Sequence, residues 1–233
     1  MKNKILIFSP TYNESENIIK LLNLIDQLNL KADILIIDDN SPDGTWKVVQ
    51  DYSKNKKNIH LIIREKKEGL DTAHKIAYEY SVTNNYQYLI TMDADLTHDP
   101  NKILEIIYEL RTNIFVICSR YTMGGSTDIK GFRLFISYFG NKFMKFIFNI
   151  NCHDFACAYR GYSLNKLGDF NIRNISSRGY SFFMETVYLL NSIGYDIKQV
   201  PIQFKDRAKG SSKIPQVEIF RTLKNLFLLK IKK

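Results

Sequence analysis

The chain has 233 residues, a hydrophobic content of 45% and a formal net charge of +9. This length suits one large domain, and the apolar content is that of an ordinary globular core, which excludes large-scale disorder. No run of about 18 apolar residues occurs, so we expect no bilayer-spanning helix. The apolar run Ile5 to Phe8 is too short for the core of a signal peptide and fits a buried strand.

Positive charge is concentrated at the end of the chain. Residues 205–233 hold nine basic and two acidic side chains, a net charge of +7. Such a segment favours an anionic partner (phosphate, nucleic acid or a lipid headgroup surface), although a solvated lysine-rich helix has the same composition. We predict one domain over residues 1–213, followed by a basic amphipathic helix over 214–233 that contacts a membrane surface.

Three cysteines occur, and no two of them form a Cys-x-x-Cys pair: Cys118, Cys152 and Cys157. Their odd number and spacing favour a reduced, cytoplasmic protein rather than a disulfide framework. We interpret all three as small buried apolar side chains.

The first half of the chain alternates short apolar strands with helices. Asn13 and Glu16 stand three apart, as in a capping arrangement, and predict a helix start near them, with the helix running through Leu30. Such alternation predicts a mostly parallel sheet covered by helices, with ligands beyond the carboxyl ends of its strands. Strands are expected at 5–9, 33–38, 59–64, 88–92 and 114–119, and further helices at 45–53, 70–80 and from Asp99-Pro100 onward.

The second half has a different composition, dense in phenylalanine and lysine. A helix is expected over 133–149, in which Arg133 and Ser137 share one face. A second face is aromatic, and both core packing and membrane contact explain it. Its members are Phe135, Phe139, Phe143 and Phe146. A strand over 195–204 and a basic amphipathic helix over 217–232 complete the expected elements.

Acidic residues follow two of the expected strands. Asp38 and Asp39 follow the second strand, and Asp93 and Asp95 follow the fourth. Two carboxylates that flank one small residue can bind Mg²⁺ or Mn²⁺ through oxygen, and the cation would neutralise a nucleotide diphosphate as a leaving group. An Asp-x-Asp triplet also caps helices and turns. The second acidic strand end favours the metal, because so many carboxylates would otherwise repel one another.

Glycine-rich phosphate loops are absent from the sequence. No Gly-x-Gly-x-x-Gly follows the first strand, and no Gly-x-x-x-x-Gly-Lys-Ser/Thr occurs, which excludes a classical dinucleotide motif and a P-loop motif. A metal-bound diphosphate without a P-loop favours nucleotide-sugar chemistry.

Six motifs then resemble those of family 2 glycosyltransferases, and most closely those of the polyprenyl-phosphate (dolichol-phosphate) mannose synthases. They occur in the family's order and cover about residues 5 to 213. They are Pro10-Thr11-Tyr12-Asn13-Glu14, Asp38-Asp39-Asn40-Ser41-Pro42-Asp43-Gly44-Thr45, Met92 to Pro100, Ser119-Arg120-Tyr121 with Gly124-Gly125, Asp154 with Tyr159-Arg160-Gly161-Tyr162, and Val200 to Phe204 with Arg207 and Gly210-Ser211-Ser212-Lys213.

The resemblance implies a single-domain GT-A fold and an inverting transfer of a hexose. It indicates mannose from GDP-mannose, a polyprenyl phosphate acceptor and Mg²⁺ or Mn²⁺ as cofactor. It also implies a cytoplasmic protein at the cytoplasmic face of a membrane, with no nucleic-acid partner and with a separate membrane-anchoring partner as an option.

Site residues follow from the matched motif positions. Asp93, Asp95 and Thr97 are expected at the metal. The nucleotide sugar is expected at Pro10, Tyr12, Glu14, Asp39, Asp43 and Asp93. The acceptor phosphate is expected at Arg120, Arg133, Ser137, Arg207 and Lys213, and the residues expected to be catalytic are Asp95, Arg120 and Arg207.

Some residues depart from the family pattern, and two other functions remain open. Asp71 stands where the family has a glycine, and Tyr159 where it has a phenylalanine. One alternative is a family 2 enzyme that uses another nucleotide sugar, such as UDP-glucose, or a glycan hydroxyl acceptor with Asp154 as base. The other is a non-catalytic protein that binds anionic membranes or nucleic acid through the basic tail.

Overall fold

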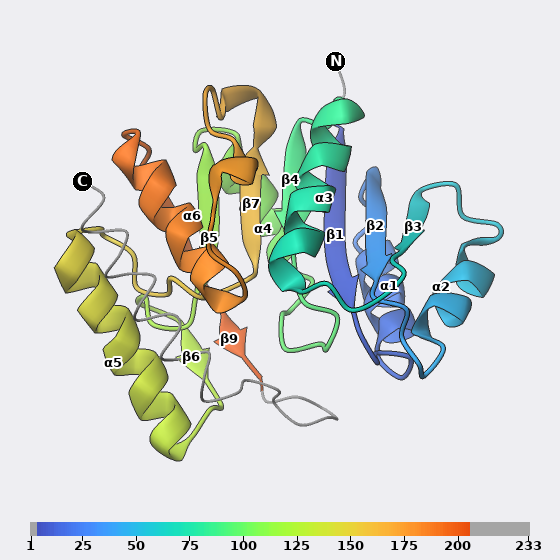
Figure 1. The fold of residues 1–233 in the computed structure, drawn as a ribbon, viewed down its shortest axis with the longest axis horizontal. Coiled ribbons are helices and arrows are strands. Elements are labelled where there is room, and N and C mark those ends of the chain that lie inside the picture. Colours follow the sequence, from blue (N-terminus) through green and yellow to red (C-terminus); the bar gives the residue numbers. More distant parts are fainter. Residues whose placement is uncertain (1–3, 206–233) are drawn as a thin grey trace.

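The computed structural model describes residues 4–205 (Figure 1). The expected helix at 217–232, together with Arg207 and Lys213, lies outside the described residues. The strands are β1 (Ile5–Thr11), β2 (Ala32–Asp38), β3 (Ile59–Ile63), β4 (Tyr88–Thr91), β5 (Phe115–Ser119), β6 (Ser126–Thr127), β7 (Arg160–Ser163), β8 (Ile197–Pro201) and β9 (Gln203–Phe204). The helices are α1 (Ile18–Gln27), α2 (Thr45–Ser53), α3 (Leu70–Thr83), α4 (Lys102–Leu110), α5 (Gly131–Phe148) and α6 (Tyr180–Ser192), with short 3-10 turns at Leu164–Lys166 and Ile172–Asn174.

Within residues 4–205, seven strands form one sheet in the order β3-β2-β1-β4-β7-β5-β8, and β6 pairs with β9. Strand β1 is parallel to β2 and β4, β2 is parallel to β3, and β5 is parallel to β8. Strand β7 is antiparallel to both of its neighbours, β4 and β5, so these two run in the same direction. The mostly parallel sheet is thereby confirmed, with one reversed strand that the sequence did not predict.

The central strands are buried on both faces, which explains their unbroken apolar runs. In β1 the residues Leu6 to Phe8 are fully buried, and in β2 so are Leu35 to Ile37. A parallel strand covered on both sides has no solvent face and therefore lacks alternation. Each fully buried leucine, isoleucine or phenylalanine contributes about 1.5–3 kcal/mol to folding.

Helices cover both faces of the sheet, as β7 demonstrates. A side chain at Gly161 would point at α4, because a Cβ there would lie 2.4 Å from Cγ2 of Ile106. The preceding residue, Arg160, places its guanidinium 4.8 Å from the ring centroid of Phe183 in α6. Successive residues of a strand face opposite sides, so α4 and α6 lie on opposite faces. Figure 1 shows α6 beside α3, in front of the sheet.

The expected capping arrangement at Asn13 and Glu16 is wrong. Helix α1 begins at Ile18, and Asn13 has a left-handed φ of 61°. The backbone N–H of Asn13 donates to Oγ of Ser41, and that of Glu14 donates to Oγ1 of Thr45. These bonds to the loop after β2 hold the segment out of the helix until residue 17.

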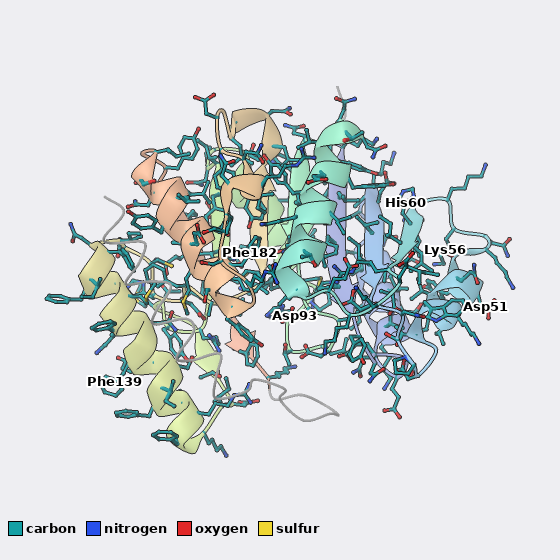
Figure 2. The ribbon with its side chains drawn as sticks, in the orientation of Figure 1. Asp51, Lys56, His60, Asp93, Phe139 and Phe182 are labelled. Carbon is teal, nitrogen blue, oxygen red and sulfur yellow. The ribbon has the colours of Figure 1, made fainter. Side chains whose placement is uncertain are left out.

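Helix α5 presents an aromatic surface to solvent. Of the two interpretations of its phenylalanine face, core packing is wrong, because the rings are between 50% and 82% exposed. They are Phe132, Phe135, Phe139, Phe143 and Phe146. Figure 2 shows Phe139 on the outer side of α5, pointing away from the sheet.

Candidate active site at the carboxyl edge of the sheet

Four parallel strands end at the same edge of the sheet with polar residues. Strands β1 and β2 end at Thr11 and Asp38, β4 ends at Thr91 just before Asp93, and β5 ends at Ser119 just before Arg120. Because β7 runs in the opposite direction, the segment that precedes it reaches this same edge. The fold therefore brings together five of the six sequence motifs and the described part of the sixth, Val200 to Phe204, as a doubly wound sheet does for its ligands.

Asp38 organises the loop that follows β2. Its carboxylate is fully buried and accepts hydrogen bonds from Oγ1 of Thr11 (2.7 Å), from the backbone N–H of Ser41 (2.8 Å) and from Oγ of Ser41 (2.7 Å). Three donors satisfy a buried carboxylate, which would otherwise be costly in this environment. Asp38 thus supports the site rather than facing a ligand.

Asp43 links the loops after β1 and β2. Its Oδ2 accepts the backbone N–H of Ser15 at 3.0 Å, and its Oδ1 accepts the N–H and the hydroxyl of Thr45 at 3.0 and 2.6 Å. Burial acts to raise the pKa of Asp43, but these hydrogen bonds outweigh it and lower the pKa below its ordinary value. The observed contacts are structural, and a nucleotide contact by Asp43 stays a prediction.

Asp39 forms a buried ion pair with Arg64, a residue that the sequence analysis missed. Both Nε and Nη2 of Arg64 contact Oδ1 of Asp39, and Nη2 also donates to the carbonyl of Gly69 at 3.1 Å. Burial raises the pKa of Asp39, and the opposing effect of Arg64 is smaller. The sequence feature that could have identified Arg64 is its position directly after the third strand, because two other strands of the same sheet are followed by acidic residues.

The remaining residues expected at the nucleotide lie on the first strand and the loop after it. Pro10 lies in β1, opposite Ile37 of β2. The ring of Tyr12 lies beneath the Lys67 ammonium, 4.0 Å from its centroid. Oε2 of Glu14 accepts the side-chain amide of Asn17 at 2.8 Å. These residues lie close to Asp39, whose backbone N–H donates to the carbonyl of Thr11, and a base pocket formed by them stays a prediction.

The segment after β4 carries the two carboxylates expected at the metal. Asp95 is buried, and its Oδ1 accepts both the N–H of Thr97 at 3.2 Å and the Thr97 hydroxyl at 2.7 Å. Asp93 is partly exposed, and Figure 2 shows it below the strands, at the edge of the sheet. Leu96, between Asp95 and Thr97, has a left-handed φ of 62°. Thr97 thus contacts Asp95 directly, and its own contact with a metal stays a prediction.

The residues present fit a cation that is bound partly by the protein and partly by the phosphates of a substrate. Within residues 4–205, no group of three or more His, Cys, Asp or Glu side chains is arranged to hold a metal by itself. Mg²⁺ is commonly held by one or two carboxylates together with substrate phosphates, because it keeps several oxygen ligands from water or nucleotide. Asp93 and Asp95 match that donor set.

His98 is buried and contacts the same segment from inside the protein. Its Nδ1 accepts the backbone N–H of Asp93 at 3.0 Å, and its ring stacks on Tyr159 at a centroid distance of 5.0 Å. The Tyr159 hydroxyl donates to the backbone carbonyl of Asp99 at 3.1 Å. Tyr159 stands where the family has a phenylalanine, and its additional hydroxyl therefore has a hydrogen-bond partner.

Arg120 pairs with Asp154 across the end of β5. Nε of Arg120 lies 2.6 Å from Oδ2, Nη2 lies 2.7 Å from Oδ1, and the Arg120 backbone N–H donates to Oδ2 at 3.1 Å. Burial alone would lower the pKa of Arg120, but the Asp154 carboxylate outweighs it and raises the pKa above its ordinary value. Arg120 remains a cation, with two of its three nitrogens committed to Asp154.

Ser137 is connected to Arg120 through one residue. The hydroxyl of Tyr121 bonds to Oγ of Ser137 at 2.7 Å, and the Arg120 guanidinium lies 5.0 Å from the Tyr121 ring centroid. Arg133, one turn earlier on α5, is exposed. The structure thus places Arg120 and Ser137 in one neighbourhood, while Arg207 and Lys213 fall in the part of the chain that it does not describe.

Two glycines allow the loop after β5 to fold back on Arg120. Gly124 has a φ of 86°, which favours glycine. A Cβ on Gly125 would lie 2.6 Å from the carbonyl oxygen of Ser119 and 2.7 Å from that of Arg120. The glycine pair of the fourth motif is therefore required by backbone packing beside the arginine.

Asp71, which departs from the family glycine, lies at the start of α3. It is buried, and its Oδ1 accepts the backbone N–H of Gly179 at 3.0 Å. The carboxylate joins the beginning of α3 to the loop before α6. The substitution is therefore accommodated by a specific hydrogen bond.

Comparison with known proteins agrees with this geometry. Residues 6–169 match the family described as glycosyl transferase family 2. An undecaprenyl-phosphate mannosyltransferase of Micrococcus luteus is 30% identical, over 91% of this chain and 87% of its own length. A polyprenol monophosphomannose synthase of Mycolicibacterium smegmatis is 29% identical, over 90% of this chain and 80% of its own.

Solved structures show the same fold at low identity. A glucosyl-3-phosphoglycerate synthase from Mycobacterium tuberculosis, in complex with Mn²⁺, UDP and phosphoglyceric acid, is similar with a TM-score of 0.69 and 15% identity. The match covers 97% of this chain and 76% of that one. A mannosyltransferase from Pyrobaculum calidifontis, in complex with GDP-Man and Mn²⁺, gives 0.62 and 16%, over 98% of this chain and 64% of that one. The expected GT-A fold is confirmed.

Proposed function

The chain belongs to glycosyltransferase family 2, and we propose that it transfers a mannosyl residue from GDP-mannose to a polyprenyl phosphate with the help of a divalent cation. One observation carries the proposal. Asp93 and Asp95, which suit a metal-bound diphosphate, lie at the same edge of the sheet as Asp39 and Arg120. Two relatives that match nine tenths of the chain bear names with this acceptor class and this sugar.

In the proposed reaction the donor binds across the ends of β1, β2 and β4. Asp39, held by Arg64, and Tyr12 and Glu14 contact the nucleoside, and Pro10 and Asp43 complete that pocket. Asp93 and Asp95 hold Mg²⁺ or Mn²⁺, with Thr97 adjacent. The cation supplies positive charge that stabilises the departing diphosphate.

The acceptor phosphate approaches from the side of β5 and α5. Arg120, Arg133 and Arg207 have the planar N–H groups that suit phosphate, and Ser137 and Lys213 add donors. The attacking oxygen belongs to a phosphate that is already ionised at neutral pH. A strong general base is therefore unnecessary. The protein accelerates the transfer mainly by positioning the two substrates.

The observed pairing of Asp154 supports a phosphate acceptor over a glycan hydroxyl. A hydroxyl acceptor needs a base, for which Asp154 was the candidate. Asp154 is fully buried, and each of its oxygens accepts a hydrogen bond from Arg120. A carboxylate committed in this way is poorly placed to remove a proton from a bound sugar.

A donor-hydrolysis screen tests the proposed donor. The chain is incubated with Mn²⁺ and GDP-mannose, UDP-glucose or other nucleotide sugars, without acceptor, and release of nucleoside diphosphate is measured. We expect the fastest release from GDP-mannose, with none in chelator. Faster release from UDP-glucose would replace the proposed donor and leave the family assignment intact.

We further propose that the enzyme acts as a peripheral protein at the cytoplasmic face of a membrane, where a separate anchoring partner is an option. None of the helices within residues 4–205 has the length and apolar character needed to span a bilayer. The exposed aromatic surface of α5 supports peripheral contact, because residues 129–153 contain Lys130, Arg133, Lys142 and Lys145 and no acidic residue. Aromatic rings flanked by cations suit the interface of anionic lipid.

Co-sedimentation with vesicles tests the membrane contact. Binding to vesicles that contain phosphatidylglycerol should fall as salt rises, and the double variant Phe139→Ser, Phe143→Ser should bind less well. Tyr108→Ser is the matched control, since Tyr108 is 65% exposed on α4, away from this surface. Unchanged binding by the double variant would assign the contact to another part of the chain.

A further inference from the structure

We propose that His98 is a positioning residue for Asp93, and that it acts through Nδ1 as an acceptor for the Asp93 backbone N–H. The inference rests on the proposed function only in taking Asp93 as a metal-binding residue. From the sequence alone His98 has no role of its own, and the structure gives it one.

The imidazole is enclosed by side chains that fix the plane of its ring. His98 is 2% exposed, its ring stacks on Tyr159 with an interplanar angle of 23°, and the Phe204 ring meets it edge-on at 5.9 Å. Tyr159 precedes β7, and Phe204 ends β9. A ring held from two sides directs its nitrogens along fixed lines.

The hydrogen bond determines which nitrogen carries the proton. Nδ1 accepts the N–H of Asp93 at 3.0 Å, so its lone pair is used and the neutral ring carries its proton on Nε2. Nε2 lies 3.8 Å from Oδ2 of Asp93, on the side of the carboxylate. One imidazole therefore meets both the backbone and the side chain of the same residue.

The segment needs such support because its backbone is unusual. Leu96 adopts a left-handed φ of 62°, which non-glycine residues rarely adopt unless their surroundings hold them there. Contacts within residues 4–205 that hold the segment include His98 to Asp93 at its start, Thr97 to Asp95 in its middle, and Tyr159 to Asp99 at its end. The contact from His98 reaches a residue expected to bind the cation from another part of the same segment.

Three substitutions of His98 distinguish the effect of the hydrogen-bond acceptor at Nδ1 from the effect of ring packing. His98→Asn retains an oxygen near the position of Nδ1, His98→Gln places its amide near the position of Nε2, and His98→Phe retains the stacked ring without an acceptor. Binding of Mn²⁺ in the presence of GDP is followed from the electron paramagnetic resonance signal of free Mn²⁺. We expect the Gln and Phe variants to bind Mn²⁺ about 10- to 100-fold more weakly, and Asn to stay within about threefold of wild type.

Controls distinguish positioning from general damage. His60→Phe removes a histidine from β3 and should not change Mn²⁺ binding, and thermal melts verify that each variant is folded. Equal Mn²⁺ affinity in all three His98 variants, whether normal or weakened, would overturn the proposal, because it requires the acceptor atom to matter.

Nitrogen-15 NMR of the wild-type chain gives a readout that needs neither metal nor turnover. The chain has four histidines, and the signal that disappears in His98→Phe identifies His98. We expect the tautomer with its proton on Nε2, and a proton on Nδ1 would refute the inference. If wild type binds no Mn²⁺ with GDP, the proposed function fails, while the tautomer still tests the contact with Asp93.

Discussion

Arg120 and Asp154 form a two-pronged ion pair that joins the end of β5 to the segment before β7, with Nε 2.6 Å from Oδ2 and Nη2 2.7 Å from Oδ1. Because Asp154 is fully buried, its removal leaves a cation without its counter-charge inside the protein. We expect Asp154→Ala to lower the free energy of unfolding by about 3–5 kcal/mol, measured by urea denaturation. Asp51→Ala is the control, since its exposed pair with Lys54 should contribute about 1 kcal/mol or less. Similar losses of unfolding free energy in the two variants would mean that the Arg120–Asp154 pair contributes no more than an exposed pair.

Asp95 is expected to be indispensable for turnover and dispensable for the fold. Asp95→Ala removes a proposed ligand, and its loss should abolish transfer while the far-ultraviolet circular dichroism stays that of wild type. Chelation of divalent cations should abolish transfer by the wild type in the same way. Full activity in the variant or in chelator would contradict the metal assignment.

Gly125 is expected to tolerate no side chain. The atoms that a Cβ would meet belong to the backbone of Ser119 and Arg120, so they cannot rotate away, and Gly125→Ala should displace the loop that carries Arg120. We expect a loss of transfer activity and a lower melting temperature. In Gly140→Ala the new Cβ meets nothing within 4 Å, and alanine is favoured over glycine inside α5 by about 1 kcal/mol. A wild-type melting temperature and activity for Gly125→Ala would refute the packing argument.

His74 should make stability depend on pH below neutrality. Burial among Phe8, Phe182 and Phe183, followed by the nearby Arg160 charge, lowers the pKa of His74 to about 3. In the unfolded chain the pKa is about 6.5, so between these values the unfolded state binds the extra proton. Stability is therefore greatest above pH 6.5 and falls as the pH drops towards 3, by up to about 1.4 kcal/mol per pH unit from this group.

His74→Phe isolates that contribution from the carboxylates. The free energy of unfolding of wild type and variant is measured in urea between pH 7 and pH 4.5. We expect the wild type to lose stability more steeply on acidification. Parallel curves for the two proteins would show that the pKa of His74 is not depressed.

Much of the fold could be predicted because strand and turn patterns are local. Helix α2 runs from Thr45 to Ser53 as predicted, and β2 was located by its run of apolar residues between two aspartates. Strand β7 was missed because its sequence, Arg-Gly-Tyr-Ser, has no apolar run. Nε and Nη2 of its buried Arg160 donate to the backbone carbonyls of Cys157 and Phe155, and no sequence pattern predicts that a charged residue is buried in this way.

The sequence predicted several residues of the candidate site, but few of the side-chain contacts among them. Asp39, Asp95 and Arg120 stand at strand ends, which the alternation of elements reveals. Their partners are separated in sequence, as Arg120 is from Asp154, or lacked a recognised role, as did Arg64. Side-chain pairing over such distances leaves no periodic signal in a single sequence.

Transfer of radiolabelled mannose from GDP-mannose to a polyprenyl phosphate in the presence of Mn²⁺ is the decisive measurement of the proposed activity. The organic phase is extracted and counted for mannosyl lipid, in parallel with chelator and with the Asp95→Ala variant. We expect labelled lipid only with wild type, Mn²⁺ and phosphorylated polyprenol, and none with the unphosphorylated alcohol. Label that stays in the aqueous phase with active, metal-bound enzyme, or that is transferred equally to the alcohol, would contradict the proposed activity.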